Sequence, residues 1–229
     1  MINFKKYGKR CLSLFLAASM ILMPAVQAFA EEETAAATTD STQTEEEDRE
    51  TQRQNCYAIA PDSNRVENWP QGPATYADSA IVMDMNSGAV LYSKQIEKKH
   101  YPASITKLLT TLVALDNAEL TDTVEFSQDS ISFLEYGDAH IGMTPGEQIS
   151  MEDALYAVLL ASANEVSYAV AESVGKKMGG GYDTFIQAMN DESEKLGCTG
   201  SHWTNANGLH DEQHYTTAHD MARIGAAVY

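Results

Sequence analysis

The sequence predicts an α/β (α+β) fold in which a β-hairpin comes first and a run of helices follows. Two short runs rich in Val, Ile, Leu and Tyr, residues 79–85 (SAIVMDM) and 89–95 (AVLYSKQ), have the composition of strands. The turn residues Asn86, Ser87 and Gly88 separate them, which favours an antiparallel hairpin. After residue 100, apolar residues recur at helical spacing. Strands followed by a run of helices are typical of α+β and α/β proteins.

Each expected helix has its own boundary signals. The first is expected to begin at Ser104 and to be buried, because a run of aliphatic residues follows its start. Ser150, with Asp153 three positions later, fits the N-cap of a second helix. A turn around Pro145 and Gly146 precedes it. Three further segments have helical patterns: 162–181, which ends at glycines, 182–197, which stops at Gly197, and 216–229.

The predicted sheet is incomplete in this chain. A lone hairpin is barely stable in water, so it needs further strands to pair with. Residues 100–229 do not supply several clear strands. The last helical segment runs to Tyr229 without a cap or a breaker. We therefore expect the missing strands to lie beyond Tyr229 and the sequence to be truncated.

The first 75 residues are expected to lie outside the folded domain. Residues 1–30 read as a secretory signal peptide, with a basic start, an apolar core and the small residues Ala28 and Ala30 at the cleavage site. Residues 31–75 are predicted to be an acidic disordered linker, and order is expected to begin near Tyr76. The mature protein is thus expected to be secreted and extracytoplasmic.

Net charge and cysteine content exclude some functions. The net charge of −18 becomes −22 once the four basic residues of the signal peptide are removed. Such acidity argues against nucleic acid and against electrostatic docking to anionic lipid. Two cysteines remain after processing, Cys56 and Cys198, and we expect both to be free.

A serine and a lysine three positions apart, Ser104 and Lys107, could form a nucleophile and its base. Residues at this spacing share one face of a helix, so the amine can reach the hydroxyl. The lysine can accept the proton only if burial or nearby positive charge lowers its pKa. A serine at a helix start also lies among free N–H groups, which can stabilise an oxyanion.

This short pattern is weak evidence alone. Ser173 and Lys176 repeat it near the glycine-rich end of a helix, where the lysine would be solvated, so we interpret that copy as a chance match. Ser104 could equally be a simple helix cap.

A second polar pair, Ser162 and Asn164, lies between two apolar segments and 58 residues after Ser104. A hydroxyl and an amide two apart on a connection can point into one cleft. The alternative is a capping box formed by Ser162 and Glu165.

Ser104-x-x-Lys107 followed by Ser162-x-Asn164 resembles the penicillin-binding proteins and serine β-lactamases. Within that group the chain is most similar to the serine-type D-alanyl-D-alanine carboxypeptidases, from about Tyr76 to the last residue. The similar segments are YPASITKLLT, LLASANEVSYAVAE and TNANGLHDEQHYTTAHDMARI. The resemblance implies an antiparallel sheet flanked by helices plus a helical subdomain, with residues 76–229 as the N-terminal part of the catalytic domain.

The resemblance also implies a role for each matched residue. Ser104 would be the acyl-forming nucleophile, and its N–H would form half of the oxyanion hole. Lys107 would accept its proton, and Ser162 would pass a proton to the departing D-alanine. Asn164 would hold the substrate carbonyl or orient Lys107. Family members remove the terminal D-alanine of peptidoglycan pentapeptides without metal or cofactor, and β-lactams acylate the same serine.

The chain departs from the family pattern in one respect. The third motif, Lys-Thr-Gly on a strand, is absent. That strand supplies the second oxyanion N–H and the site for the terminal carboxylate, so the 229-residue chain is expected to be inactive or nearly so. The family's C-terminal amphipathic membrane anchor is expected to be missing too.

The nearest alternative is a class A β-lactamase, which deacylates with a glutamate in a Glu-x-x-Leu-Asn setting. The closest stretch, Ser193 to Gly197, has a serine in place of the glutamate and a glycine in place of the asparagine.

Two alternatives belong to other classes. A metal site is suggested by three clustered histidines with two acids nearby, although the pattern lacks a typical ligand motif (His210, His214, His219, Asp211 and Asp220). A non-catalytic module that binds the cell wall is the other alternative, because the third motif is absent.

Overall fold

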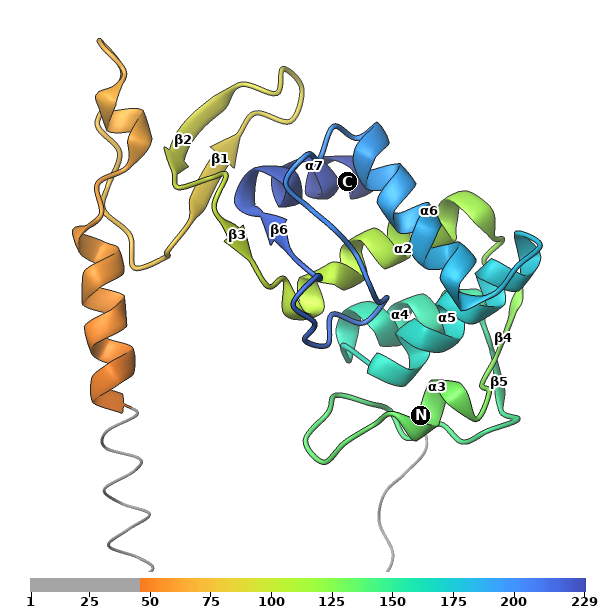
Figure 1. Ribbon diagram of the computed structural model, residues 1–229. Helices are drawn as coiled ribbons and strands as arrows, with labels where there is room; N and C mark the ends of the chain where they lie inside the picture. Colours follow the sequence, from red (N-terminus) through yellow and green to blue (C-terminus); the bar gives the residue numbers. More distant parts are fainter. Residues whose placement is uncertain (1–45) are drawn as a thin grey trace, which may run out of the picture. The chain divides into compact units, whose positions relative to one another are not determined.

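The computed structural model describes residues 46–229 (Figure 1). The predicted signal peptide and the first part of the acidic linker lie outside the described residues. The chain divides into two units, Met1–Thr51 and Gln52–Tyr229, and the second contains every element discussed below apart from the start of one helix.

The predicted hairpin is present. Strand β1 (Ala80–Met83) pairs antiparallel with β2 (Val90–Lys94), with Ala80 opposite Lys94 and an irregularity after Val82. The side chain of Asp84 closes the turn by accepting hydrogen bonds from the N–H and hydroxyl of Ser87 at 2.8 and 2.5 Å.

Four further short strands form two more antiparallel pairs. Strand β3 (Lys99–His100) pairs with β6 (Thr216–Thr217), and β4 (Thr123–Glu125) pairs with β5 (Gln148–Ser150). Residues 100–229 were expected not to supply several clear strands, and the strands found there, β4, β5 and β6, have only two or three residues each. Strands of two or three residues are too short to show the alternation by which a sequence reveals them.

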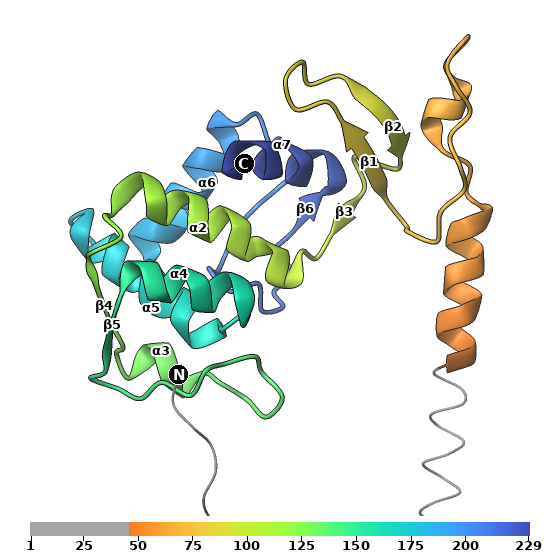
Figure 2. The same cartoon turned by 180° about the vertical axis from the view of Figure 1, so that it is seen from behind.

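Helix α2 (Thr106–Asn117) contacts four other helices: α4 (Met151–Leu160), α5 (Asn164–Lys177), α6 (Tyr182–Lys195) and α7 (Ala218–Val228). Figure 2 shows the arrangement of these helices from behind. The short helices are η1 (Asp62–Arg65), η2 (Ala103–Ile105) and α3 (Asp129–Ser132). The core is built from the inner faces of the long helices, including Leu109, Val113, Val166, Val170, Phe185 and Met189. The central position of α2 confirms the expectation of a buried helix after Ser104.

The N-cap prediction for α4 is confirmed. The hydroxyl of Ser150 accepts a hydrogen bond from the N–H of Asp153 at 3.1 Å. None of the helices within the described residues is both long and apolar enough to span a bilayer. Cys56 and Cys198 are both unpaired, as expected.

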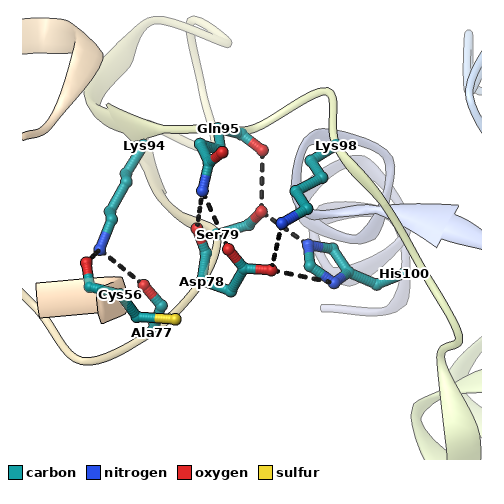
Figure 3. A network of polar contacts seen from close by, with 8 residues as sticks. All are labelled: Cys56, Ala77, Asp78, Ser79, Lys94, Gln95, Lys98 and His100. Atoms are coloured by element: carbon teal, nitrogen blue, oxygen red, sulfur yellow. Dashed lines mark hydrogen bonds and ion pairs between the residues drawn. The ribbon is translucent and has the colours of Figure 1, made fainter. Parts of the chain in front are cut away.

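The acidic segment differs from its prediction, because residues 46–58 are helical. Glu, Gln and Arg are good helix formers. The ammonium of the fully buried Lys94 donates hydrogen bonds to the carbonyls of Cys56, Thr75 and Ala77 at 2.6, 2.8 and 2.7 Å, partly visible in Figure 3. A cation at the last carbonyls of a helix is stabilising, so this contact fastens the end of the segment to the hairpin.

A second set of contacts in Figure 3 fixes the chain between the hairpin and Ser104. The hydroxyl of Ser79 donates to the carbonyl of Gln95 at 2.8 Å and lies 2.7 Å from Nε2 of His100. Asp78 pairs with Lys98 at 2.7 Å. These bonds hold β3, and β3 leads directly into η2.

Candidate active site

Ser104 and Lys107 lie together at the start of α2. Ser104 is exposed in η2, whereas Lys107, in the first turn of α2, is only 2% exposed. The amine nitrogen Nζ of Lys107 lies 3.3 Å from Oγ of Ser104. The helix does not begin at Ser104 as predicted: α2 starts at Thr106, and no side chain caps either η2 or α2. The 3₁₀ turn continues directly into the α-helix, which excludes the capping role for Ser104.

The amine of Lys107 has three acceptors. It donates to Oδ1 of Asn164 at 2.8 Å and to the backbone carbonyl of Asn207 at 2.6 Å, as well as to Ser104. Burial lowers the pKa of Lys107 from 10.5 to about 8, against the opposing effects of Glu165 and Asp138. About one amine in ten is then unprotonated at pH 7, so a free base faces the serine at physiological pH.

Asn164 is the first residue of α5 and is buried. Its N–H donates to the carbonyl of Ala139 at 2.8 Å, which fixes the backbone, and its side-chain oxygen faces Lys107. Of the two roles considered for Asn164, orienting Lys107 is the one for which a contact is present.

Ser162 lies two residues before Asn164 in the sequence, but its side chain is not hydrogen-bonded to Ser104, Lys107 or Asn164. Its hydroxyl makes no hydrogen bond to another described residue, and its backbone has a φ of 54°. A non-glycine residue in this left-handed region is uncommon and strained. The alternative interpretation, a capping box formed by Ser162 and Glu165, is contradicted, because Ala163 is the N-cap of α5 and the Glu165 carboxylate accepts from the N–H of Ile141 instead.

The second Ser-x-x-Lys copy has none of this geometry. Lys176 is exposed and pairs with Glu172 at 3.0 Å, while Ser173 accepts from the N–H of Glu125 at 3.4 Å. The chance-match interpretation therefore fits the structure.

The sequence analysis assigned no role to Asn207, although the segment that contains this residue is one of those that carry the family resemblance. Its backbone carbonyl contacts Lys107, and a carbonyl has no sequence signal because every residue carries one. The neighbouring Gly208 did offer a signal. It has a φ of +85°, and a Cβ there would lie 1.9 Å from the carbonyl oxygen of Ala103. Only glycine lets the segment pack this closely against the turn that carries Ser104.

The three histidines of the metal hypothesis do not converge. His210 packs against Tyr101, His214 is buried with Nε2 2.8 Å from Oγ1 of Thr106, and His219 pairs with Glu97 at 2.7 Å. No group of three or more His, Cys, Asp or Glu side chains within residues 46–229 is arranged to hold a metal ion. Burial lowers the pKa of His214 to about 4, which keeps this imidazole neutral beside α2.

Comparison with solved structures defines the class: the fold is that of the penicillin-binding proteins. Penicillin-binding protein 5 from Haemophilus influenzae matches with a TM-score of 0.62 at 29% identity, over 69% of this chain and 46% of that one. A D-alanyl-D-alanine carboxypeptidase from Mycobacterium tuberculosis H37Rv matches with a TM-score of 0.59 at 32% identity, over 74% and 60%.

Within that class the chain belongs to the D-alanyl-D-alanine carboxypeptidase family, whose sequence pattern matches residues 66–229. D-alanyl-D-alanine carboxypeptidase DacF of Bacillus subtilis (strain 168) is 34% identical over 151 residues, which is 64% of this chain and 37% of that protein. The DacC protein of Escherichia coli (strain K12) is 31% identical over 180 residues, 75% of this chain and 44% of that protein. The chain thus spans about two-fifths of the length of these relatives. The family resemblance and the fold class predicted from the sequence are both confirmed.

Proposed function

We propose that this chain is part of a serine D-Ala-D-Ala carboxypeptidase, which removes the terminal D-alanine from peptidoglycan pentapeptides in cell-wall biogenesis. The observation that carries the proposal is the buried amine of Lys107, 3.3 Å from the exposed hydroxyl of Ser104 and with a pKa lowered to about 8. This pair can generate a nucleophile near neutral pH. Family membership supports the substrate class.

Acylation follows from this geometry. Oγ of Ser104 attacks the carbonyl carbon of the D-Ala-D-Ala peptide bond while its proton passes to Lys107. The N–H of Ser104, at the start of the η2–α2 turn, can donate to the developing oxyanion. The C–N bond then breaks, and the proton returns to the nitrogen of the departing D-alanine. Water hydrolyses the resulting ester and restores the serine.

Ser162 and Asn164 complete the proposed site. The hydroxyl of Ser162, held in a strained turn and without a partner among the described residues, is free to relay the proton to the leaving amine. Asn164 orients the amine of Lys107 through its 2.8 Å contact. A β-lactam presents a strained amide to the same serine and would leave a stable acyl-enzyme.

The proposed location follows from the substrate. Peptidoglycan lies outside the cytoplasmic membrane, and the predicted signal peptide over residues 1–30 would deliver the protein there. We propose residues 76–229 as the N-terminal part of the catalytic domain, with the acidic segment 31–75 between it and the signal peptide.

The experiment is D-alanine release from a diacetyl-Lys-D-Ala-D-Ala peptide by the full-length protein, not by the 229-residue chain, beside the same protein with Ser104→Ala. The proposal predicts release by the wild type and loss of at least about a thousandfold in the variant. A folded wild-type protein that releases no D-alanine, or equal release by the variant, would refute it. Binding of peptidoglycan without release would favour the non-catalytic wall module.

A further inference from the structure

Glu165 is a buried carboxylate that the proposed mechanism does not use. It is the second residue of α5 and has no exposed surface. Oε1 accepts a hydrogen bond from the N–H of Ile141 at 2.7 Å, while Oε2 has no partner among the described residues. A buried carboxylate with an unpaired oxygen is costly unless another interaction compensates it.

The hydrogen bond from Ile141 joins Glu165 to residues 133–144, which we call the 133–144 loop. The preceding residue, Asn164, donates its own N–H to the carbonyl of Ala139 in the same loop at 2.8 Å. Two adjacent residues at the start of α5 therefore hold the loop. Because the side chain of Asn164 also contacts the amine of Lys107, the loop and the amine share one anchoring point.

The charges around Lys107 give Glu165 a second connection to the amine. Two acids act on Lys107 and oppose the effect of its burial on the pKa, Glu165 from α5 first and Asp138 from the 133–144 loop second. The other groups in contact with the amine carry no charge (Ser104, Asn164 and Asn207). His214, whose Nε2 contacts Oγ1 of Thr106 in the first turn of α2, is neutral because burial lowers its pKa to about 4.

We propose that Glu165 is a positioning residue that couples the 133–144 loop to the amine of Lys107, through its hydrogen bond to the loop and its buried negative charge. The charge opposes the loss of the proton from the amine, so it moves the pH range over which the amine can act as a base upward, against the larger opposite effect of burial. It also keeps that base strong enough to take a proton from a hydroxyl. The inference rests on the proposed function for its meaning in catalysis.

The variant Glu165→Gln tests the charge separately from the hydrogen bond. A glutamine can still accept from the N–H of Ile141 through Oε1, but it removes the negative charge. The pKa of Lys107 is measured directly by NMR of lysines labelled at Cε, with the Lys107 signal assigned by its absence in Lys107→Arg. We expect Glu165→Gln to lower this pKa by about one unit. The midpoint of the pH profile for acylation by a fluorescent penicillin should move down by the same amount.

Two further variants complete the design. Glu172→Gln makes the same substitution two turns along α5, where the carboxylate pairs with the exposed Lys176, and should leave the pKa of Lys107 unchanged. Glu165→Ala removes the hydrogen bond as well, so amide exchange in the 133–144 loop should become at least about tenfold faster than in Glu165→Gln.

The outcomes separate this inference from the proposed function. An unchanged pKa of Lys107 in Glu165→Gln, or an equal change in Glu172→Gln, would overturn the coupling whatever the acylation result. A lowered pKa in a protein that penicillin does not acylate at all would support the coupling and contradict the proposed function.

Discussion

The depressed pKa of Lys107 makes the stability of the protein depend on pH, and Lys107→Met exposes that dependence. Below pH 8 the amine is charged in both the folded and the unfolded states, and its burial destabilises the fold. Between pH 8 and 10.5 the unfolded chain binds more protons at this residue, so stability rises with pH across this window. The difference between 10.5 and about 8 corresponds to about 3 kcal/mol.

The assay is urea denaturation of the wild type and Lys107→Met at several pH values from 7 to 10.5. The other lysines and the tyrosines titrate in both proteins, so their contributions cancel in the difference. We expect the free energy of unfolding of the wild type, relative to the variant, to increase by about 3 kcal/mol over this range. A difference that stays flat would mean that the folded amine has an ordinary pKa, and it would refute the role of this lysine as a base.

Three other substitutions have definite expected results. Asn164→Ala removes the acceptor that orients the amine, and we expect acylation by penicillin to slow about a hundredfold in stopped-flow fluorescence, with an unchanged rate contradicting the role. Gly208→Ala forces a Cβ against the carbonyl of Ala103, so it should lower the free energy of unfolding by about 2–4 kcal/mol. The control Gly225→Ala has open space around its Cβ and should change the free energy of unfolding by less than about 1 kcal/mol. Equal effects of the two substitutions would refute the packing argument. Lys94→Met removes three hydrogen bonds to carbonyls, so amide exchange of residues 52–58 should accelerate while that of α2 does not.

Elements with local signals were predictable from the sequence. The hairpin turn around Asn86 and Gly88, the Ser150 cap and the helical spacing of residues 182–197 each depend on contacts within a few positions, and each is present. Residues 46–58 form a helix that composition alone placed in a disordered linker, and its end is fastened by Lys94, which lies 38 positions away from Cys56. A contact across that distance leaves no pattern in a single sequence.

The candidate site shows the same division. The spacing of Ser104 and Lys107 predicted their contact because one turn of helix brings them together. From the sequence, Ser162 fitted a capping box with Glu165 as well as it fitted a catalytic role. The positive φ of Ser162 and the hydrogen bond from the distant N–H of Ile141 to Glu165 decide against the capping box. The hydrogen bond from Lys107 to the backbone carbonyl of Asn207 could not be predicted. The two residues lie 100 positions apart, and the path of the backbone decides which carbonyl accepts from the amine.

The central claim is that the unprotonated amine of Lys107 takes the proton of Ser104. The most direct test compares penicillin acylation of the wild type and Lys107→Arg between pH 6 and 9.5, with the acylated peptide identified by mass spectrometry. The wild-type protein should be acylated at Ser104, and its acylation rate should rise with pH with a midpoint near pH 8. The arginine variant keeps its proton throughout this range, so it should show almost no labelling. A wild-type rate independent of pH, or an arginine variant labelled as fast as the wild type, would contradict the claim.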